Sequence, residues 1–230
     1  LTGGDPFMNK HFAKIAEGFT KRGLTPFIAT KSLVTKEKAR ILKDIGIRSI
    51  QVSIDAPVAN VADFLTNSPG SFNQAVTSID NLIKAGIEVT TNTVITAYNA
   101  LLIPDLIKFL EAKGITRMRR SQFGRSYYKG DQDDLFLPKR AGLWLEKEIN
   151  RLREAGEIQY GLEFTFMEDE SFKDPAVKEE AYMTRAVCSG GRWGCIITSN
   201  GKVVPCDEMP AAPEYIAGDV SRQSILEMWQ

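Results

Sequence analysis

Apolar and polar residues follow two different periods along this chain. Apolar residues return every three or four positions, as in an amphipathic helix, over residues 9–23, 36–45, 71–85, 101–113 and 139–155. Short runs rich in β-branched residues predict strands at residues 25–30, 48–55, 87–96, 115–123 and 158–167. The repeated order of helix, glycine and strand predicts βαβ units and a parallel sheet, either open and doubly wound or part of a (β/α) barrel.

The pattern changes in the second half of the chain. Residues 124–138 are polar and predict a loop or lid, whereas residues 196–205 hold two β-branched runs around an Asn-Gly pair, a strong hairpin signal. Cys188, Cys195 and Cys206 flank this hairpin. They can be small buried hydrophobic residues, but clustered thiols are better explained as ligands of a soft metal. Zinc and iron–sulfur clusters usually take four ligands, so a further ligand would come from outside this chain.

Composition narrows the class of protein. The chain has 230 residues, of which 43% are hydrophobic, and its 29 basic residues balance 29 acidic ones. These values exclude a disordered or collagen-like chain, and zero net charge argues against a nucleic-acid partner. No apolar run approaches the roughly 20 residues that cross a membrane, and the polar start shows no signal peptide. A low, odd number of cysteines is typical of a reducing compartment, so we expect a cytoplasmic protein.

A glycine pair near the start of the chain is the first candidate ligand site. Gly3 and Gly4 let a ligand approach the backbone closely, and Asp5 can accept a hydrogen bond from an ammonium group. A simple turn explains the same residues.

Polar residues in two predicted strands form the second candidate site. Ser53 and Asp55 end the strand at residues 48–55, two positions apart and therefore on one side of the sheet. A hydroxyl and a carboxylate at the carboxyl end of a parallel strand suit a ribose diol, although a turn cap explains them too. Asn92 lies inside the next strand and either joins a core network or contacts a ligand within a barrel.

Taken in order, these motifs resemble a radical S-adenosylmethionine (SAM) enzyme with a C-terminal SPASM domain. TGGDP resembles the GGE motif that follows the second barrel strand, and QVSIDAP resembles the ribose-contacting fourth strand. Cys188, Gly201 and Cys206 fit the C-x(9–15)-G-x4-C pattern that opens a SPASM domain. The resemblance covers essentially the whole chain.

The resemblance implies an α/β fold with two parts. Residues 1–167 would form a partial (β/α)6 TIM-like barrel of parallel strands that starts at the end of the second strand. Residues 168–187 would be a linker, and residues 188–230 the N-terminal part of a Cys-rich SPASM domain with its β-hairpin. The CxxxCxxC motif of the family, which ligates the SAM-cleaving cluster, is absent, so we expect a truncated and by itself inactive fragment.

The resemblance also implies roles for the candidate residues. Gly3, Gly4 and Asp5 would hold the methionyl amino group of SAM, with Asp5 standing where the family usually has Glu. The other assignments follow the same motifs. Ser53 and Asp55 would contact the ribose, Asn92 would lie near SAM, and Cys188, Cys195 and Cys206 would ligate an auxiliary [4Fe–4S] cluster. No acid or base residue is assigned.

The activity that the resemblance implies is that of an iron–sulfur oxidoreductase. The complete protein would use a [4Fe–4S] cluster, with ligands outside this chain, to form a 5′-deoxyadenosyl radical that abstracts hydrogen from a peptide or protein. Thioether or carbon–carbon crosslinking of a ribosomal peptide is the first substrate hypothesis. A sulfatase-maturating or cofactor-biosynthetic enzyme is the second, and a degenerate, non-catalytic barrel is the third. A flavodoxin or ferredoxin would supply the electron.

Overall fold

The computed structural model describes residues 4–124, 133–159, 190–192, 194–206 and 212–229. Within these residues the chain divides into two compact units, an N-terminal one that ends in the segment 133–159 and a C-terminal one that begins at residue 190. The strand predicted at residues 158–167, apart from its first two residues, and the linker at 168–187 lie outside the described residues.

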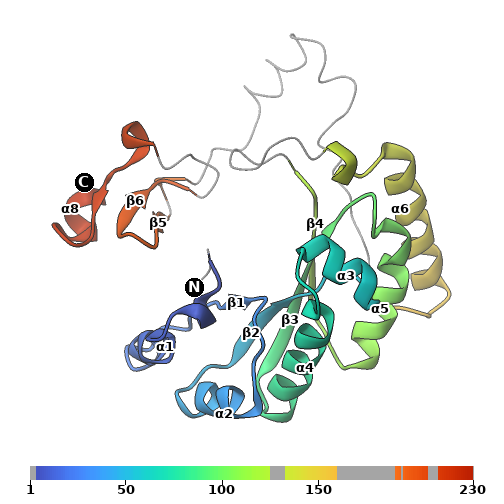
Figure 1. The fold of residues 1–230 in the computed structure, drawn as a ribbon, viewed down its shortest axis with the longest axis horizontal. Coiled ribbons are helices and arrows are strands. Elements are labelled where there is room, and N and C mark those ends of the chain that lie inside the picture. The colour runs from blue at the N-terminus through green and yellow to red at the C-terminus, as the bar shows by residue number, and fades with distance from the viewer. Residues whose placement is uncertain (1–3, 125–132, 160–189, 193, 207–211, 230) are drawn as a thin grey trace, which may run out of the picture. The chain divides into compact units, whose positions relative to one another are not determined.

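The N-terminal unit is built around a parallel sheet of four strands in the order β1-β2-β3-β4 (Figure 1). The strands are β1 (Ala29–Thr30), β2 (Ser49–Ser53), β3 (Glu88–Ile95) and β4 (Met118–Gln122). Helices connect successive strands, as right-handed crossovers of a parallel sheet require. The connecting helices are α2 (Lys36–Asp44), α3 (Ala59–Thr66), α4 (Ser71–Lys84) and α5 (Ile103–Ala112), with the 3-10 turn η2 (Ala100–Leu102) before α5. The 3-10 turn η1 (Pro6–Met8) and α1 (Phe12–Thr20) precede β1, and the 3-10 turn η3 (Asp133–Leu135) and α6 (Lys139–Glu154) follow β4.

Local signals in the sequence explain where these elements begin and end. Thr35 caps α2 through a hydrogen bond from the Lys38 amide to its hydroxyl at 3.2 Å. Gly86 follows α4 with a φ of 71°, which a residue with a Cβ adopts only at a cost, and turns the chain into β3.

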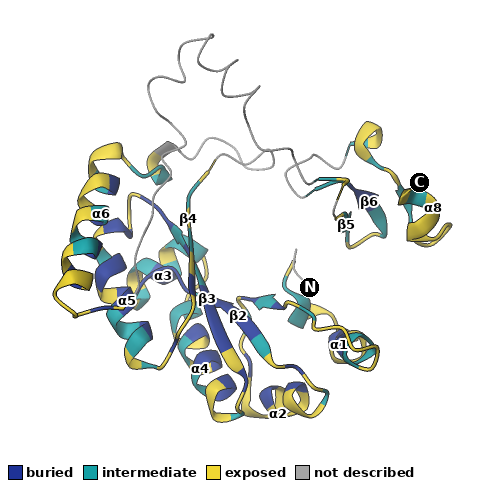
Figure 2. Cartoon of the chain, turned by 180° about the vertical axis from the view of Figure 1, so that it is seen from behind, coloured by how far each residue is buried: buried dark blue, intermediate teal, exposed yellow. Residues whose placement is uncertain are grey.

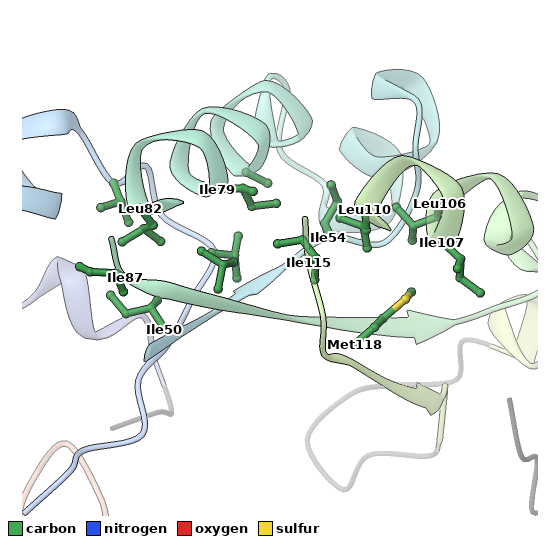
Figure 3. Packing of buried hydrophobic residues seen from close by; sticks show 14 of the residues in the cluster. Ile50, Ile54, Ile79, Leu82, Ile87, Leu106, Ile107, Leu110, Ile115 and Met118 are labelled. Carbon is green, nitrogen blue, oxygen red and sulfur yellow. The ribbon is translucent and has the colours of Figure 1, made fainter. Parts of the chain in front are cut away.

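The hydrophobic core lies between one face of the sheet and its helices (Figure 3). Ile50 of β2, Ile54 just after it and Met118 of β4 meet Ile79 from α4 and Leu110 from α5 in this layer. Figure 2 shows the same division, with the buried sides of α4, α5 and α6 turned inward and their exposed sides outward. The core therefore uses alternate strand residues, and the residues between them face the opposite side of the sheet.

The predicted α/β fold is confirmed, with differences at its edges. The strand expected at residues 25–30 is paired only at Ala29–Thr30, and the helix expected at 101–113 begins as the 3-10 turn η2. Helix α3 was not predicted, because Val58 at its N-terminus offers no capping side chain and its residues carry no clear helical period.

The C-terminal unit holds a small antiparallel sheet in the order β5-β6-β7. Its strands are β5 (Ile196–Ile197), β6 (Lys202–Val204) and β7 (Gly218–Asp219). The 3-10 turn η5 (Pro213–Tyr215) lies between β6 and β7, and α8 (Ile225–Trp229) follows β7. The predicted hairpin is confirmed as β5 and β6, and Gly201 in its turn has a φ of 83°. Lys202, and then Ser221, donate hydrogen bonds that hold the pKa of the Asp219 carboxyl well below its usual range. In the described part of the chain, no helix is both long enough and apolar enough to cross a membrane.

Candidate functional site

The face of the sheet opposite the core is polar. In the strand register, Gln51 of β2 lies beside Thr90 of β3. Two residues further toward the carboxyl ends of the strands, Ser53 lies beside Asn92, and Asn92 lies beside Arg119 of β4. Because neighbouring residues in a parallel register point to the same side, these five side chains share one face. The structure therefore brings Ser53 and Asn92, both nominated from the sequence, onto adjacent positions.

Asp55 lies just beyond the end of β2 and is 6% exposed. Its Oδ1 accepts a hydrogen bond from the Val94 amide at 2.8 Å, and its Oδ2 lies 3.5 Å from the Nζ of Lys31. One oxygen thus ties β2 to β3, and the other points to a shallow cleft that Lys31, Ser53 and Ser71 also line. A carboxylate oxygen beside a hydroxyl and a cation can accept hydrogen bonds from vicinal hydroxyl groups.

Asp5 lies at the start of η1 and reaches the end of β1. Its two carboxylate oxygens accept hydrogen bonds from the Thr30 hydroxyl and from the backbone amides of Phe7, Lys31 and Ser32, at distances of 2.6–3.0 Å. Gly4 precedes it with a φ of 58°. Gly3 lies outside the described residues.

Hydrogen bonding dominates the ionisation of Asp5. Burial alone would raise the pKa of its carboxyl, but the hydrogen bonds from Thr30, Lys31, Phe7 and Ser32 outweigh burial and hold the pKa below its ordinary value. The folded protein therefore binds fewer protons at this group than the unfolded chain does in acid. The stability that Asp5 contributes is complete above its unfolded-state pKa and is lost as the pH falls through the folded-state pKa.

We expect the loss of stability caused by substituting Asp5 to disappear in acid. Asp5→Asn should lower the melting temperature at about pH 6, and the gap to the unsubstituted protein should narrow as the pH approaches about 3. Thermal denaturation followed by circular dichroism at several pH values measures both curves. A gap that is constant over this range, or that widens in acid, would contradict this account of the Asp5 carboxylate.

Asn99 is a site residue that the sequence did not reveal. It is completely buried, its Nδ2 donates to the carbonyls of Asp55 at 2.7 Å and Val94 at 2.8 Å, and its Oδ1 accepts from the Thr96 amide at 2.7 Å. It fixes the backbone of both strand ends that carry the polar residues. An Asn just after a strand was the only available signal, and it is equally typical of an ordinary turn.

Arg119 and Phe27 reach across the polar face from opposite edges of the sheet. The Arg119 guanidinium carbon lies 5.9 Å from the centre of the Phe27 ring, a cation–π contact between the outermost strand β4 and the residue that precedes β1 by two positions. Arg117, two residues earlier in the chain, is instead paired with Glu88 at 2.8 Å. The polar face therefore carries the guanidinium group of Arg119, which is level with Ser53 and Asn92 rather than with Asp55.

The cysteines gather at one end of the small sheet. Ile196 is paired with Val204, so Cys195 and Cys206 both lie at the open end of the β5–β6 hairpin, offset by one position. Both are half-buried free thiols, and Cys195 lines a pocket with Val203, Pro205 and Met228. Cys188 lies outside the described residues, and among the residues that are described no group of three metal-binding side chains occurs. One thiol in a largely apolar pocket and a second at the same end of the hairpin fit part of the ligand set of an iron–sulfur cluster.

Two family models match this chain. Residues 1–110 match the model described as the radical SAM superfamily, and residues 188–230 match the SPASM model, described as an iron–sulfur cluster-binding domain.

The curated relatives that the chain resembles carry names of different enzymes. The chain is 29% identical over its whole length to an "AdoMet-dependent heme synthase" of Methanosarcina barkeri, of which it covers 67%. It is 26% identical over its whole length to a "PqqA peptide cyclase" of Methylocella silvestris, of which it covers 60%. The chain thus spans about three fifths to two thirds of these relatives.

Solved structures share the fold at low sequence identity. Streptococcus suis SuiB matches with a TM-score of 0.75 and 15% identity over 99% of this chain and 54% of its own. Native anSMEcpe with bound AdoMet and Kp18Cys peptide matches with a TM-score of 0.69 and 14% identity over 100% of this chain and 65% of its own. At these identities the likeness concerns the fold alone.

Proposed function

Since the chain belongs to the radical SAM superfamily and carries a C-terminal SPASM domain, we propose that the complete protein binds SAM at the carboxyl edge of its parallel sheet and modifies a peptide or protein. The observation that carries the proposal is the convergence of Ser53 and Asp55 at the carboxyl end of β2, beside Asn92 of β3 and at the cleft that Lys31 also lines. This is where ligands bind in parallel α/β proteins.

Each polar group suits a part of SAM. The free side of the Asp55 carboxylate and the Ser53 hydroxyl would bind the ribose diol, and the loop at Gly3, Gly4 and Asp5 would receive the methionyl amino group. Asn92, beside Ser53 in the register, would contact SAM from the neighbouring strand. Together these groups fix the orientation of SAM and therefore the direction in which its reactive carbon points.

When bound, SAM and the reduced [4Fe–4S] cluster supply a 5′-deoxyadenosyl radical that can remove a hydrogen atom from a substrate. The role of this chain is to hold SAM in one pose and to exclude competing reactions from the polar face. The cysteines of the C-terminal unit, Cys188, Cys195 and Cys206, would hold an auxiliary [4Fe–4S] cluster. A flavodoxin or ferredoxin is the proposed electron donor.

A peptide substrate is supported by the neighbours of the fold. The solved structures include anSMEcpe with a bound Kp18Cys peptide and SuiB bound to the precursor peptide SuiA, and one curated relative is a peptide cyclase. The alternative is a cofactor-biosynthetic activity, which is supported by the heme synthase of Methanosarcina barkeri, since it is 29% identical to this chain and the peptide cyclase is 26% identical. A sulfatase-maturating activity is the other form of this second hypothesis.

The test is SAM cleavage by the complete protein after anaerobic reconstitution with iron and sulfide. With dithionite as reductant, we expect methionine and 5′-deoxyadenosine in equal amounts. Asp55→Asn keeps an oxygen for the Val94 amide but loses the charge, so we expect the KM for SAM to rise about tenfold or more while the melting temperature changes little. The absence of 5′-deoxyadenosine from a fully reconstituted protein would refute the hypothesis of an active radical SAM enzyme and favour that of a non-catalytic barrel.

A matched substitution separates the site from general damage. Asp80 pairs with Lys113 at 2.7 Å on the outer surface, where an ion pair contributes little to stability. Asp80→Asn should leave the KM for SAM unchanged. An equal rise in both variants would remove Asp55 from the proposed SAM site.

A further inference from the structure

We propose that Asp5 is a positioning residue: its carboxylate fastens the glycine loop to the end of β1 and is not itself the partner of the SAM ammonium group. The inference rests on the proposed SAM site and specifies how one part of it works. It also departs from the role that the motif resemblance implies for this residue.

The contacts of Asp5 lead into the protein. Its Oδ2 accepts from the Lys31 amide at 2.6 Å and from the Ser32 amide at 2.8 Å, so it closes the turn that follows β1. Its Oδ1 accepts from the Phe7 amide at 3.0 Å and so caps η1 from within its own loop. The Thr30 hydroxyl lies 2.9 Å and 2.8 Å from the two oxygens. One carboxylate therefore joins two segments that are 25 residues apart.

These donors use the full capacity of the carboxylate. An ionised carboxyl group offers about four lone-pair positions. Four separate donors occupy them: three backbone amides and the hydroxyl of Thr30, which is 3% exposed. An ammonium group could bind Asp5 only by displacing one of these donors, which would lose its hydrogen bond to a charged acceptor.

The length of the side chain agrees with this role. The bond to the Phe7 amide spans only two residues and needs the short stem of Asp, whereas Glu would carry its carboxylate one methylene further. Asp5 thus fits the backbone of its own turn. The SAM ammonium group is therefore left to acceptors other than the Asp5 carboxylate.

A ligand that lacks the ammonium group distinguishes a direct contact from a positioning role. We would measure the dissociation constants of SAM and of its deamino analogue with the complete, reconstituted protein and with Asp5→Asn and Thr30→Val. The Asn side chain keeps one acceptor oxygen, but its NH2 group replaces the second carboxylate oxygen and faces donors that can no longer bond there. If Asp5 positions the loop, Asp5→Asn should weaken both ligands by the same factor, about tenfold, and Thr30→Val should weaken both by a smaller common factor.

The contrary result is equally definite. If Asp5→Asn weakens SAM but not the deamino analogue, Asp5 contacts the ammonium group directly and the inference is wrong. Unchanged affinities in both variants would also overturn it. Thr77→Val, on the exposed side of α4, is the matched control and should leave both affinities unchanged.

A second measurement does not depend on SAM. In the ligand-free protein, the amide of Lys31 should exchange hydrogen with solvent at least tenfold faster in Asp5→Ala, because alanine removes both oxygens and with them the acceptor of this amide. Unchanged exchange would show that Asp5 does not hold this turn, whatever the ligand. If the unsubstituted protein fails to bind SAM, the proposed function is refuted. The exchange measurement still decides whether Asp5 holds the turn that follows β1.

Discussion

Replacing Cys206 with alanine in the complete, anaerobically reconstituted protein is expected to remove one auxiliary cluster, a loss of about four iron and four sulfide ions per chain. Cys206 and Cys195 lie at the same end of the β5–β6 hairpin, and the loss of one thiolate from a four-ligand set leaves iron exposed to exchange. Cys195→Ala should give the same loss. Iron and acid-labile sulfide assays measure it directly.

The same substitution should also destabilise the C-terminal unit. Of its described hydrophobic residues only Val203 and Val204 are buried, a core too small to fold a module of this size by itself. A cluster that binds only the folded form supplies the missing free energy, so metal binding and folding are coupled. We therefore expect faster proteolysis within residues 190–229 in Cys206→Ala than in the unsubstituted protein.

The control is a residue of the same hairpin without a thiol. Ser199 lies exposed in the turn between β5 and β6, and Ser199→Ala should keep its full iron content. Iron content that is unchanged in both cysteine variants would exclude Cys195 and Cys206 as ligands. Loss of iron in all three variants would point to a hairpin that is too fragile to report on its ligands.

The part of the site that the sequence could predict follows from topology. Once the strands at residues 48–55 and 87–96 are assigned to one parallel sheet, Ser53 and Asn92 must lie near the same edge, because parallel strands share their direction. The register confirms this, with Ser53 directly opposite Asn92. Alternation likewise placed Ser53 on the face away from Ile54 and the core.

The part that the sequence could not predict depends on contacts between distant segments. Thr30 and Asp5 are 25 residues apart, and Asn99 reaches the carbonyl of Asp55 across 44 positions. No local period or spacing encodes such pairs, since they form only when the strand ends are brought together. Sequence motifs therefore nominate Asp5 as a site residue but give no sign that four donors already surround its carboxylate.

Asn99 should have a large effect on stability although it lies beyond the strands. Asn99→Ala removes the partner of three backbone groups: the buried carbonyl of Asp55, the buried amide of Thr96 and the partly buried carbonyl of Val94. Each unsatisfied buried group costs about 1–3 kcal/mol, so we expect a loss of about 3–5 kcal/mol, a large share of the roughly 5–15 kcal/mol that stabilise an ordinary domain. Urea denaturation of the complete protein, followed through the transition of the barrel domain, measures this loss.

Two further variants test the reason for this effect. Asn73 lies on the exposed side of α4, and Asn73→Ala should be neutral or slightly stabilising because alanine favours a helix. Asn99→Asp replaces the donor with a carboxyl group that faces two carbonyl oxygens, which raises its pKa in the folded state. The folded form then binds a proton more tightly than the unfolded chain, so Asn99→Asp should become less stable as the pH rises from about 5 to about 8. A stability that is independent of pH in this variant would contradict the donor role of the Asn99 amide.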